Sequence, residues 1–307
     1  MTFETALIVE SYNHAQGSAL DRLRLALVAA SRIAAACAGV EVLIADSSGD
    51  PELPALLGRE FPEMRRVDAT GLDYDEAKMK AAREARATYV VYLDGDCIPE
   101  SGWLDAHLGA LKGGAAATGG FTRYDRGFLG TVFSVLDFGF LLPAGERVLG
   151  CYAFNNTGFR RDVLLEVPLP DGPMRCRCFA HAQKLLRRGT PVRMVPSARV
   201  RHERQPFMRE RLRQGYDVVA ACWVDPDLRE CRWLRLGLLA GPLFYARSVV
   251  FDWRRLVQGR RDLELGAAQV ALALPLFPFL RLADLVGTMR ALVPRRDRRA
   301  RSQLAVG

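Results

Sequence analysis

The first 125 residues alternate between short apolar runs and longer segments in which apolar residues recur every three or four positions. Runs with the length and composition of buried strands occupy residues 5–12, 40–46, 64–69 and 89–94. Segments with the spacing of a helix that buries one face occupy residues 18–37, 51–61, 74–86 and 101–111. Strands separated by helices predict an α/β fold, with a mostly parallel sheet and helices on both of its faces.

The pattern is less regular after residue 125. Residues 151–167 predict a strand or loop followed by a helix, and residues 178–189 predict a helix that ends at Gly189. Residues 191–203 predict two short strands joined by a turn at Pro196. We therefore predict that 1–125 and 126–231 form two halves of one domain, and that 232–307 form a separate C-terminal region.

Two apolar runs, 234–251 and 265–280, mark this C-terminal region. A membrane span needs about 20 predominantly apolar residues, and each run falls short of that or is interrupted, the first by Arg247 and the second by Pro275 and Pro278. Two alternatives stay open. The runs form buried helices that cover the domain, or they form a membrane-seated hairpin or in-plane helices with arginines at the lipid headgroups.

Charge is distributed unevenly along the chain of 307 residues, which has a formal net charge of +8. Residues 232–307 hold 14 arginines and 5 acidic residues, a formal charge of +9, which leaves the rest of the chain nearly neutral. A basic region of this kind suits an anionic surface. Few aromatic residues accompany its arginines and no nucleic-acid module is recognisable, so we predict a membrane surface as the partner and no nucleic acid.

The cysteines indicate whether a zinc site is expected and in which redox state the thiols are. Cys176 and Cys178 form a C-x-C pair, but no second pair accompanies them, which argues against a zinc site there. Because no basic segment precedes an apolar run at the N-terminus, we expect no signal peptide and reduced, cytosolic thiols.

Acidic residues stand at the ends of two predicted strands. Asp94 and Asp96 form a D-x-D motif around Gly95, and Asp46 ends the run 40–46. Ligands of parallel α/β sheets bind at the carboxyl ends of the strands, and two close carboxylates suit Mg²⁺ or Mn²⁺. The alternative is that these acids belong to solvated turns.

Two basic side chains are further candidates. Lys78 lies in the predicted helix 74–86, where it either offers a positive charge to a phosphate or is an ordinary solvated residue. His202 follows a predicted strand, and it becomes a metal ligand only if the chain brings it back beside Asp96.

Several stretches, taken in order, resemble the family 2 glycosyltransferases, which have the GT-A fold. These stretches read LIVESYN, VLIADSSGD, YDEAKMKAAREARATYVVYLDGDCIPESGWL, NNTGFRRDVL and KLLRRGTPVRMVPSARVRH. The resemblance covers roughly residues 5–202, and it extends more loosely to RQGYD at 213–217.

The resemblance implies a nucleoside-diphosphate sugar donor and a divalent metal, Mg²⁺ or Mn²⁺. It implies that Asp46 contacts the base or ribose, that Asp94 holds the ribose or sugar side, and that Asp96 binds the metal. His202 is implied as a further metal or diphosphate contact. The resemblance implies that three residues line the sugar and acceptor side, namely Trp103, Asn155 and Asn156. It implies a cover over the diphosphate from Arg213, Gln214 and Tyr216, and Lys78 is implied as a further donor contact.

The sequence departs from this family at the expected general base. Many members carry a Glu-Asp pair at the start of the helix that corresponds to 178–189, whereas this chain has Arg177 and Cys178. Neither side chain suits deprotonation of a hydroxyl. His181 is the first candidate to replace the base, with Asp171 and Glu166 as others. A shifted alignment or loss of transfer are the remaining explanations. A smaller departure is Met79, where the family often has Asn.

The resemblance thus implies an inverting glycosyltransferase that moves a sugar to a lipid-linked or envelope polysaccharide acceptor. Residues 1–125 would form its nucleotide-sugar-binding half, 126–231 its acceptor-binding half, and 232–307 a membrane-associated region. We expect it at the cytoplasmic face of the plasma membrane. The alternative is a GT-A module that binds a nucleotide or a partner without catalysis.

Overall fold

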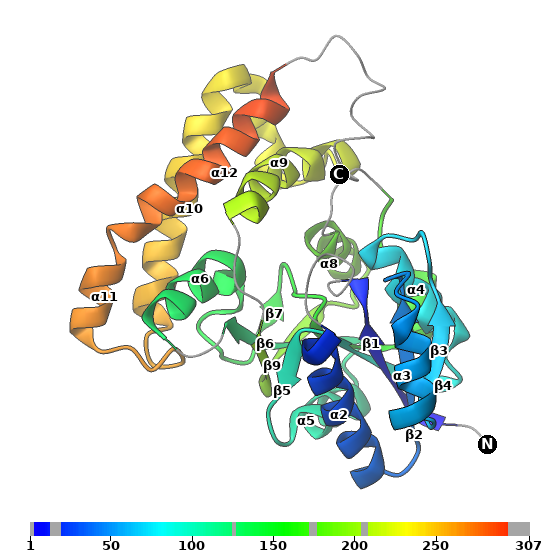
Figure 1. Ribbon diagram of the computed structural model, residues 1–307. Coiled ribbons are helices and arrows are strands. Elements are labelled where there is room, and N and C mark those ends of the chain that lie inside the picture. Colours follow the sequence, from blue (N-terminus) through cyan, green and yellow to red (C-terminus); the bar gives the residue numbers. More distant parts are fainter. Residues whose placement is uncertain (1–2, 13–19, 125–126, 172–176, 204–207, 294–307) are drawn as a thin grey trace. The chain divides into compact units, whose positions relative to one another are not determined.

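The computed structural model describes residues 3–12, 20–124, 127–171, 177–203 and 208–293 (Figure 1). Cys176 and the basic residues after 293, which entered the sequence analysis, lie outside these ranges. The chain divides into two compact units, which we describe separately. The first unit comprises Met1–Asp125, Ala144–Pro168 and Ala182–Arg204, and the second comprises Arg126–Pro143, Leu169–His181 and Gln205–Gly307.

A single sheet of nine strands organises the first unit (Figure 1). Its strands are β1 (Phe3–Glu10), β2 (Val40–Asp46), β3 (Arg65–Asp68), β4 (Ala87–Asp94), β5 (Cys97–Pro99), β6 (Ala117–Tyr124), β7 (Val148–Leu149), β8 (Asn156–Arg160) and β9 (Val192–His202). They lie in the order β3-β2-β1-β4-β8-β6-β9-β5, with β7 also beside β9. The pairs from β3 to β4 are parallel, whereas β8, β5 and β7 pair in the antiparallel sense. The sheet is therefore mixed.

Helices cover both faces of this sheet, as the alternating pattern predicted. They are α2 (Leu20–Ala36), α3 (Glu52–Glu60), α4 (Tyr74–Glu84), α5 (Trp103–Lys112) and α7 (Arg161–Glu166). Alternate strand residues such as Leu7, Ile44 and Val91 form one core with α2, α3 and α5. The opposite face contacts α4 and α7. Because β1, β2 and β4 are buried on both faces along most of their length, they read as nearly continuous apolar runs in the sequence.

The segment 191–203 corrects one prediction. The sequence indicated two short strands with a turn at Pro196, but the structure has one strand, β9. Its pairing with β6 shifts register, since Gly120 pairs with Val195 and Phe121 pairs with Arg199. Residues 196–198 thus form a bulge that the strand continues past, and Pro196 is tolerated because a bulge leaves ladder positions unpaired.

The second unit is helical. It contains α6 (Phe128–Phe138), the 3-10 helix η1 (Gly139–Leu141), α9 (Met208–Val224), the 3-10 helix η2 (Arg229–Leu239), α10 (Ala240–Gln258), α11 (Ala267–Ala273) and α12 (Leu276–Leu292). A further helix, α8 (Cys178–Arg187), runs from this unit into the first. The predicted apolar C-terminal helices are therefore present. Cys222 and Cys231 form a disulfide, which corrects the expectation of reduced thiols for these two residues.

Buried charges join the helices of the second unit. The Arg281 guanidinium donates to both carboxylate oxygens of Asp252 at 2.7 Å and also pairs with Asp284. Arg211 pairs with Asp137 at 2.8 Å and with Asp284 at 3.1 Å. The polar sides of α6, α9, α10 and α12 are consequently turned toward one another.

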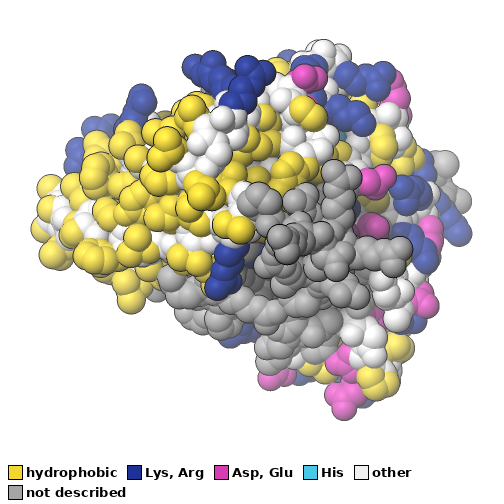
Figure 2. Space-filling view, turned by 90° about the horizontal axis from the view of Figure 1, so that it is seen from above, with side chains coloured by type: hydrophobic (Ala, Val, Ile, Leu, Met, Phe, Trp, Pro, Cys, Tyr) yellow, Lys and Arg dark blue, Asp and Glu magenta, His cyan; other side chains and the backbone are white. Residues whose placement is uncertain are grey.

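An apolar face is left on the outside of these helices. It includes Leu239, Leu243, Val250, Leu272, Phe279 and Leu282, all of which are exposed. Figure 2 shows side chains of this type as a broad yellow field with Lys and Arg at its margins. The stretches Cys231–Gln258 and Ala267–Leu292 are long and apolar enough to cross a membrane, and are thus longer than the apolar runs in the sequence. Core helices can share these properties, so both alternatives from the sequence stand.

Candidate functional site

Three acidic residues of the first unit end adjacent parallel strands. Glu10 is the last residue of β1, Asp46 of β2 and Asp94 of β4. The register pairs Glu10 with Asp94 on one side and with Ala45 on the other. All three side chains are buried. The carboxyl ends of β1, β2 and β4 therefore form one acidic edge, where ligands bind in sheets of this kind.

Lys78 provides the cation that faces this edge. Its side chain is fully buried, and its Nζ pairs with Asp94 and donates to the Phe154 carbonyl at 2.9 Å. The Tyr74 hydroxyl lies 2.6 Å from Nζ and 2.9 Å from both oxygens of Asp94. A capping box between Asp73 and Glu76 fixes the start of α4, which carries Tyr74 and Lys78. The alternative of a solvated Lys78 is thus wrong.

Glu10 is a residue that the sequence analysis did not single out. Its Oε2 accepts from the Tyr12 amide at 2.6 Å, and its Oε1 accepts from the Gly95 amide at 3.4 Å. Burial, together with the negative charge of Asp94, raises the pKa of Glu10 to about 8. The available signal was an acid at the end of an apolar strand, the same signal that identified Asp46 and Asp94.

Gly95 allows the D-x-D turn to approach β1. A Cβ at this position would lie 2.5 Å from the Glu10 carbonyl oxygen and 2.7 Å from Leu23 Cδ1. Both distances are shorter than a carbon atom tolerates, so only glycine fits without displacement of the turn.

Asp46 is held by hydrogen bonds from its neighbours. Its Oδ1 accepts from the Ser11 hydroxyl at 2.8 Å and from the Ser48 hydroxyl at 2.7 Å, and its Oδ2 accepts from Arg66 Nε at 2.7 Å. Burial opposes ionisation, but these hydrogen bonds outweigh it and lower the pKa of Asp46. Asp46 is therefore a fixed carboxylate at the edge of the site.

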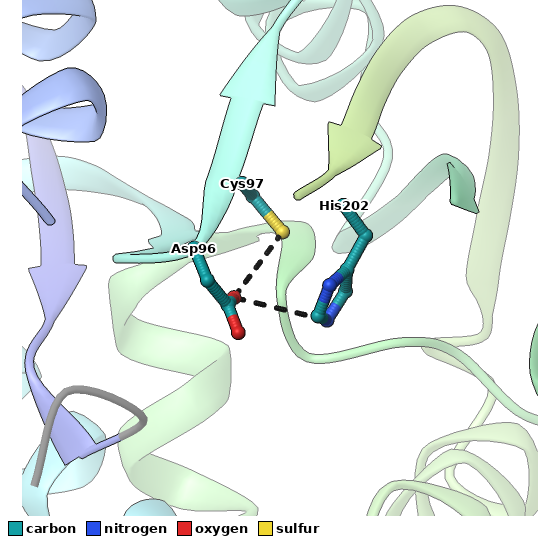
Figure 3. A group of neighbouring side chains, drawn as sticks. All are labelled: Asp96, Cys97 and His202. Carbon is teal, nitrogen blue, oxygen red and sulfur yellow. Dashed lines mark hydrogen bonds and ion pairs between the residues drawn. The ribbon is translucent and has the colours of Figure 1, made fainter. Parts of the chain in front are cut away.

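The chain does bring His202 back beside Asp96, which was the condition set by the sequence analysis. His202 Nε2 lies 3.7 Å from Asp96 Oδ1, and the Cys97 thiol donates to the same oxygen at 3.8 Å. Figure 3 shows the three side chains pointing toward one another. Antiparallel pairing of β5 with β9 places Cys97 directly opposite His202.

Trp103, Asn155 and Asn156 also lie in the first unit, and all three are buried. The Asn156 oxygen accepts from Trp103 Nε1 at 2.7 Å, and it lies 2.9 Å from His107 Nε2. The Asn156 amide donates to two backbone carbonyls. This network holds β8 to its neighbours, while the predicted sugar contacts of these residues stay predictions.

The first candidate base and the last three predicted donor contacts belong to the second unit. His181 is fully buried in α8, and Arg177 and Cys178 stand at the start of that helix. On α9, the Gln214 amide donates to Asp137 at 3.4 Å and the Tyr216 ring packs edge-on against Trp223. Arg213 lies on the same helix.

The residues of the first unit fit a divalent cation. Ligand atoms of Glu10, Asp94 and Asp96 lie within 4.8 Å of one another, and so do those of Asp96, Cys97 and His202. Three buried carboxyl groups, those of Glu10, Asp94 and Asp96, share the ammonium of Lys78 in this part of the described chain, and Glu10 with its pKa of about 8 is largely neutral there. A divalent cation would favour the ionised form of these groups by offsetting negative charge that is otherwise costly to bury.

Comparison with known proteins identifies the fold of the chain. No protein-family model matches the chain, and no curated protein matches it. Solved structures do match. The mannosyltransferase PcManGT from Pyrobaculum calidifontis, in complex with GDP-Man and Mn²⁺, has a TM-score of 0.62 and 14% identity, over 95% of this chain and 88% of that chain. The fold is GT-A.

The predicted fold class is thereby confirmed. GalNAc-T7, solved with UDP, GalNAc and Mn²⁺, matches 66% of this chain with a TM-score of 0.48 and 12% identity. This chain spans 44% of the length of that chain. At such identities the likeness shows the fold, and activity has to be argued from the site.

Proposed function

We propose that the protein is an inverting glycosyltransferase that uses a nucleoside-diphosphate sugar and Mg²⁺ or Mn²⁺. The observation that carries the proposal is the acidic edge formed by Glu10, Asp46, Asp94 and Asp96 at the strand ends of a GT-A sheet. The similar mannosyltransferase was solved with a sugar nucleotide and Mn²⁺, which supports this class of ligand.

Asp46 is the proposed contact for the base or ribose of the donor, because it is ionised and its oxygens are fixed by Ser11, Ser48 and Arg66. Asp94 is the proposed contact for the ribose or sugar. Its orientation is set by Lys78 and Tyr74.

Asp96 and His202 would hold the metal, with Asp94 beside them. The bound metal would neutralise the charge of the diphosphate, so that the nucleoside diphosphate is a better leaving group. The acceptor hydroxyl would attack the anomeric carbon from the opposite face. His181 is the proposed base, since an imidazole is the side chain that most often takes up a proton in general base catalysis.

A donor panel tests the activity. The purified chain with Mn²⁺ or Mg²⁺ should release nucleoside diphosphate from at least one nucleoside-diphosphate sugar, and Asp96→Asn should lower the rate by about 100-fold or more. The matched control is Asp68→Asn, an exposed acid at the end of the neighbouring strand β3, which should retain activity. Failure to turn over any donor, or a rate that Asp96→Asn leaves unchanged, would contradict the proposal.

We further propose a lipid-linked or envelope polysaccharide acceptor and a place at the cytoplasmic face of the plasma membrane. The support is the exposed apolar face of the second unit together with the arginines of the region 232–307. The full chain should sediment with vesicles that contain anionic lipid. It should be released from them when Leu239, Leu243 and Phe279 are replaced by Ser. A chain that stays in the supernatant would refute membrane association.

One observation favours a second candidate, a module that binds the nucleotide without transferring the sugar. Arg177 and Cys178 occupy the start of α8, where the related family has its Glu-Asp pair. Calorimetry that shows nucleotide binding, combined with no turnover of any donor, would select this candidate. A His181→Gln variant that loses turnover but keeps nucleotide binding would instead support His181 as the base.

A further inference from the structure

The D-x-D turn of this chain continues into a cysteine whose sulfur faces the same carboxylate as His202. Asp96 Oδ1 is 3.8 Å from Cys97 Sγ and 3.7 Å from His202 Nε2 (Figure 3). The group therefore offers one oxygen, one sulfur and one nitrogen, all within 4.8 Å of one another. Such a mixed donor set differs from the all-oxygen set of Glu10, Asp94 and Asp96.

The two distances from Asp96 Oδ1 are close to those of a tetrahedral zinc site. Bonds from zinc measure about 2.1 Å to oxygen, 2.3 Å to sulfur and 2.0 Å to nitrogen. At tetrahedral angles, such bonds separate oxygen from sulfur by about 3.6 Å and oxygen from nitrogen by about 3.4 Å. The two distances from Asp96 Oδ1 exceed these values by only a few tenths of an ångström, and the sulfur and the imidazole nitrogen lie within 4.8 Å of each other, so side-chain movements that also bring these two atoms together would complete the site.

The backbone holds the three residues in this arrangement without help from an ion. Cys97 and His202 are directly paired in the β5–β9 ladder. The Glu203 amide donates to the Asp96 carbonyl at 2.8 Å, which ties the D-x-D turn to the end of β9. The Tyr124 ring packs at 5.1 Å from the imidazole of His202. The His202 side chain is 10% exposed, whereas Asp96 and Cys97 are buried.

We propose that Asp96, Cys97 and His202 bind a thiophilic divalent cation of the zinc class, which competes with Mg²⁺ or Mn²⁺ for Asp96. The thiol gives its proton to the solvent as the sulfur binds the ion. Three protein ligands leave a fourth position for water or another oxygen ligand. Because thiolate and imidazole favour zinc over the harder ions, zinc binds more tightly at this site than Mg²⁺ or Mn²⁺ does.

Cobalt substitution tests the site without any sugar donor, so the result is independent of transferase activity. The metal-free full chain should give a thiolate-to-cobalt charge-transfer band and the intense visible bands of tetrahedral Co²⁺, and Zn²⁺ should abolish both. Cys97→Ser should lose the charge-transfer band and weaken Zn²⁺ binding at least about tenfold, since loss of even an outer partner costs that much. Cys151→Ser, at a partly exposed cysteine that forms no disulfide, should change neither the charge-transfer band nor Zn²⁺ binding.

Two further measurements cover the case in which Cys97→Ser fails to fold. X-ray absorption at the zinc edge of the wild-type chain should show one sulfur neighbour at about 2.3 Å. Zn²⁺ should also displace Mn²⁺ from the chain, as read by the Mn²⁺ spin resonance signal. A zinc shell of only oxygen and nitrogen, a charge-transfer band that survives Cys97→Ser, or Mn²⁺ that zinc does not displace would overturn the proposal.

Discussion

Removal of the Lys78 ammonium should destabilise the first unit more than any surface change. Lys78 is fully buried, pairs with Asp94, and lies within hydrogen-bond distance of the Tyr74 hydroxyl and the Phe154 carbonyl. Lys78→Met keeps most of the side-chain volume but leaves Asp94 as a buried carboxylate without its ammonium, close to Glu10. Breaking a buried ion pair in this way costs about 3–5 kcal/mol, a large part of the 5–15 kcal/mol typical of a folded domain.

Lys80→Met is the matched control. Lys80 lies two residues further along α4, and it donates to the Asp68 carbonyl near the surface. We expect its replacement to change stability by less than about 0.5 kcal/mol. Because the chain has two units, native-state hydrogen exchange of the β1 and β4 amides is a better measure than global unfolding, since it reports opening of the sheet itself.

Two further results would test the electrostatic reasoning. In a double-mutant cycle, Lys78→Met with Asp94→Asn should lose less stability than the sum of the single changes, by about 0.5–3 kcal/mol. Mn²⁺ should increase the stability of the Lys78→Met variant more than that of the wild type, because the ammonium that competes with the metal for the carboxylates has been removed. If Lys78→Met costs no more than Lys80→Met, or if the double variant shows simple additivity, the pair does not stabilise the site as we argue.

Three other predictions follow from individual contacts. Burial lowers the pKa of His107 in the folded chain to about 4. As the pH falls below 6.5, the unfolded chain therefore binds a proton that the folded chain does not, and the free energy of unfolding decreases by about 2 kcal/mol at pH 5. His107→Gln should remove this loss, as measured by urea titrations at pH 5 and pH 7.5. Gly95→Ala should cost about 1–3 kcal/mol and weaken Mn²⁺ binding in calorimetry, because its Cβ would lie 2.5 Å from the Glu10 carbonyl oxygen. Arg281→Met should destabilise the second unit by about 3–5 kcal/mol in thermal unfolding, whereas exposed Arg290→Met should have little effect.

Local patterns sufficed for the parallel half of the sheet. The predicted run 40–46 coincides with β2, and the helix 74–86 begins where α4 begins. These elements are specified by features close in sequence, such as a mostly apolar run or a capping box. The segment 191–203 was predicted wrongly because the register shift of β9 depends on its partner β6, which lies about 75 residues earlier in the chain. A proline read alone indicated a turn.

The residues of the candidate site also fall into two groups, those that local sequence predicts and those that depend on partners distant in sequence. Asp46 and Asp94 could be found from the sequence because each ends an apolar run, Asp96 because it completes a D-x-D motif with Asp94, and Glu10 carries the strand-end signal too. The partners that determine how these acids behave come from elsewhere in the chain. The ammonium that compensates Asp94 projects from α4, which runs outside the sheet.

The thiol and imidazole at Asp96 meet only because β5 pairs with β9 about a hundred residues later. A sequence read segment by segment identifies the acids, but their charge balance and metal preference are properties of strand pairing. That is why the Lys78 and Cys97 variants, and not further changes to the aspartates, separate a generic acidic edge from the particular site that this chain builds.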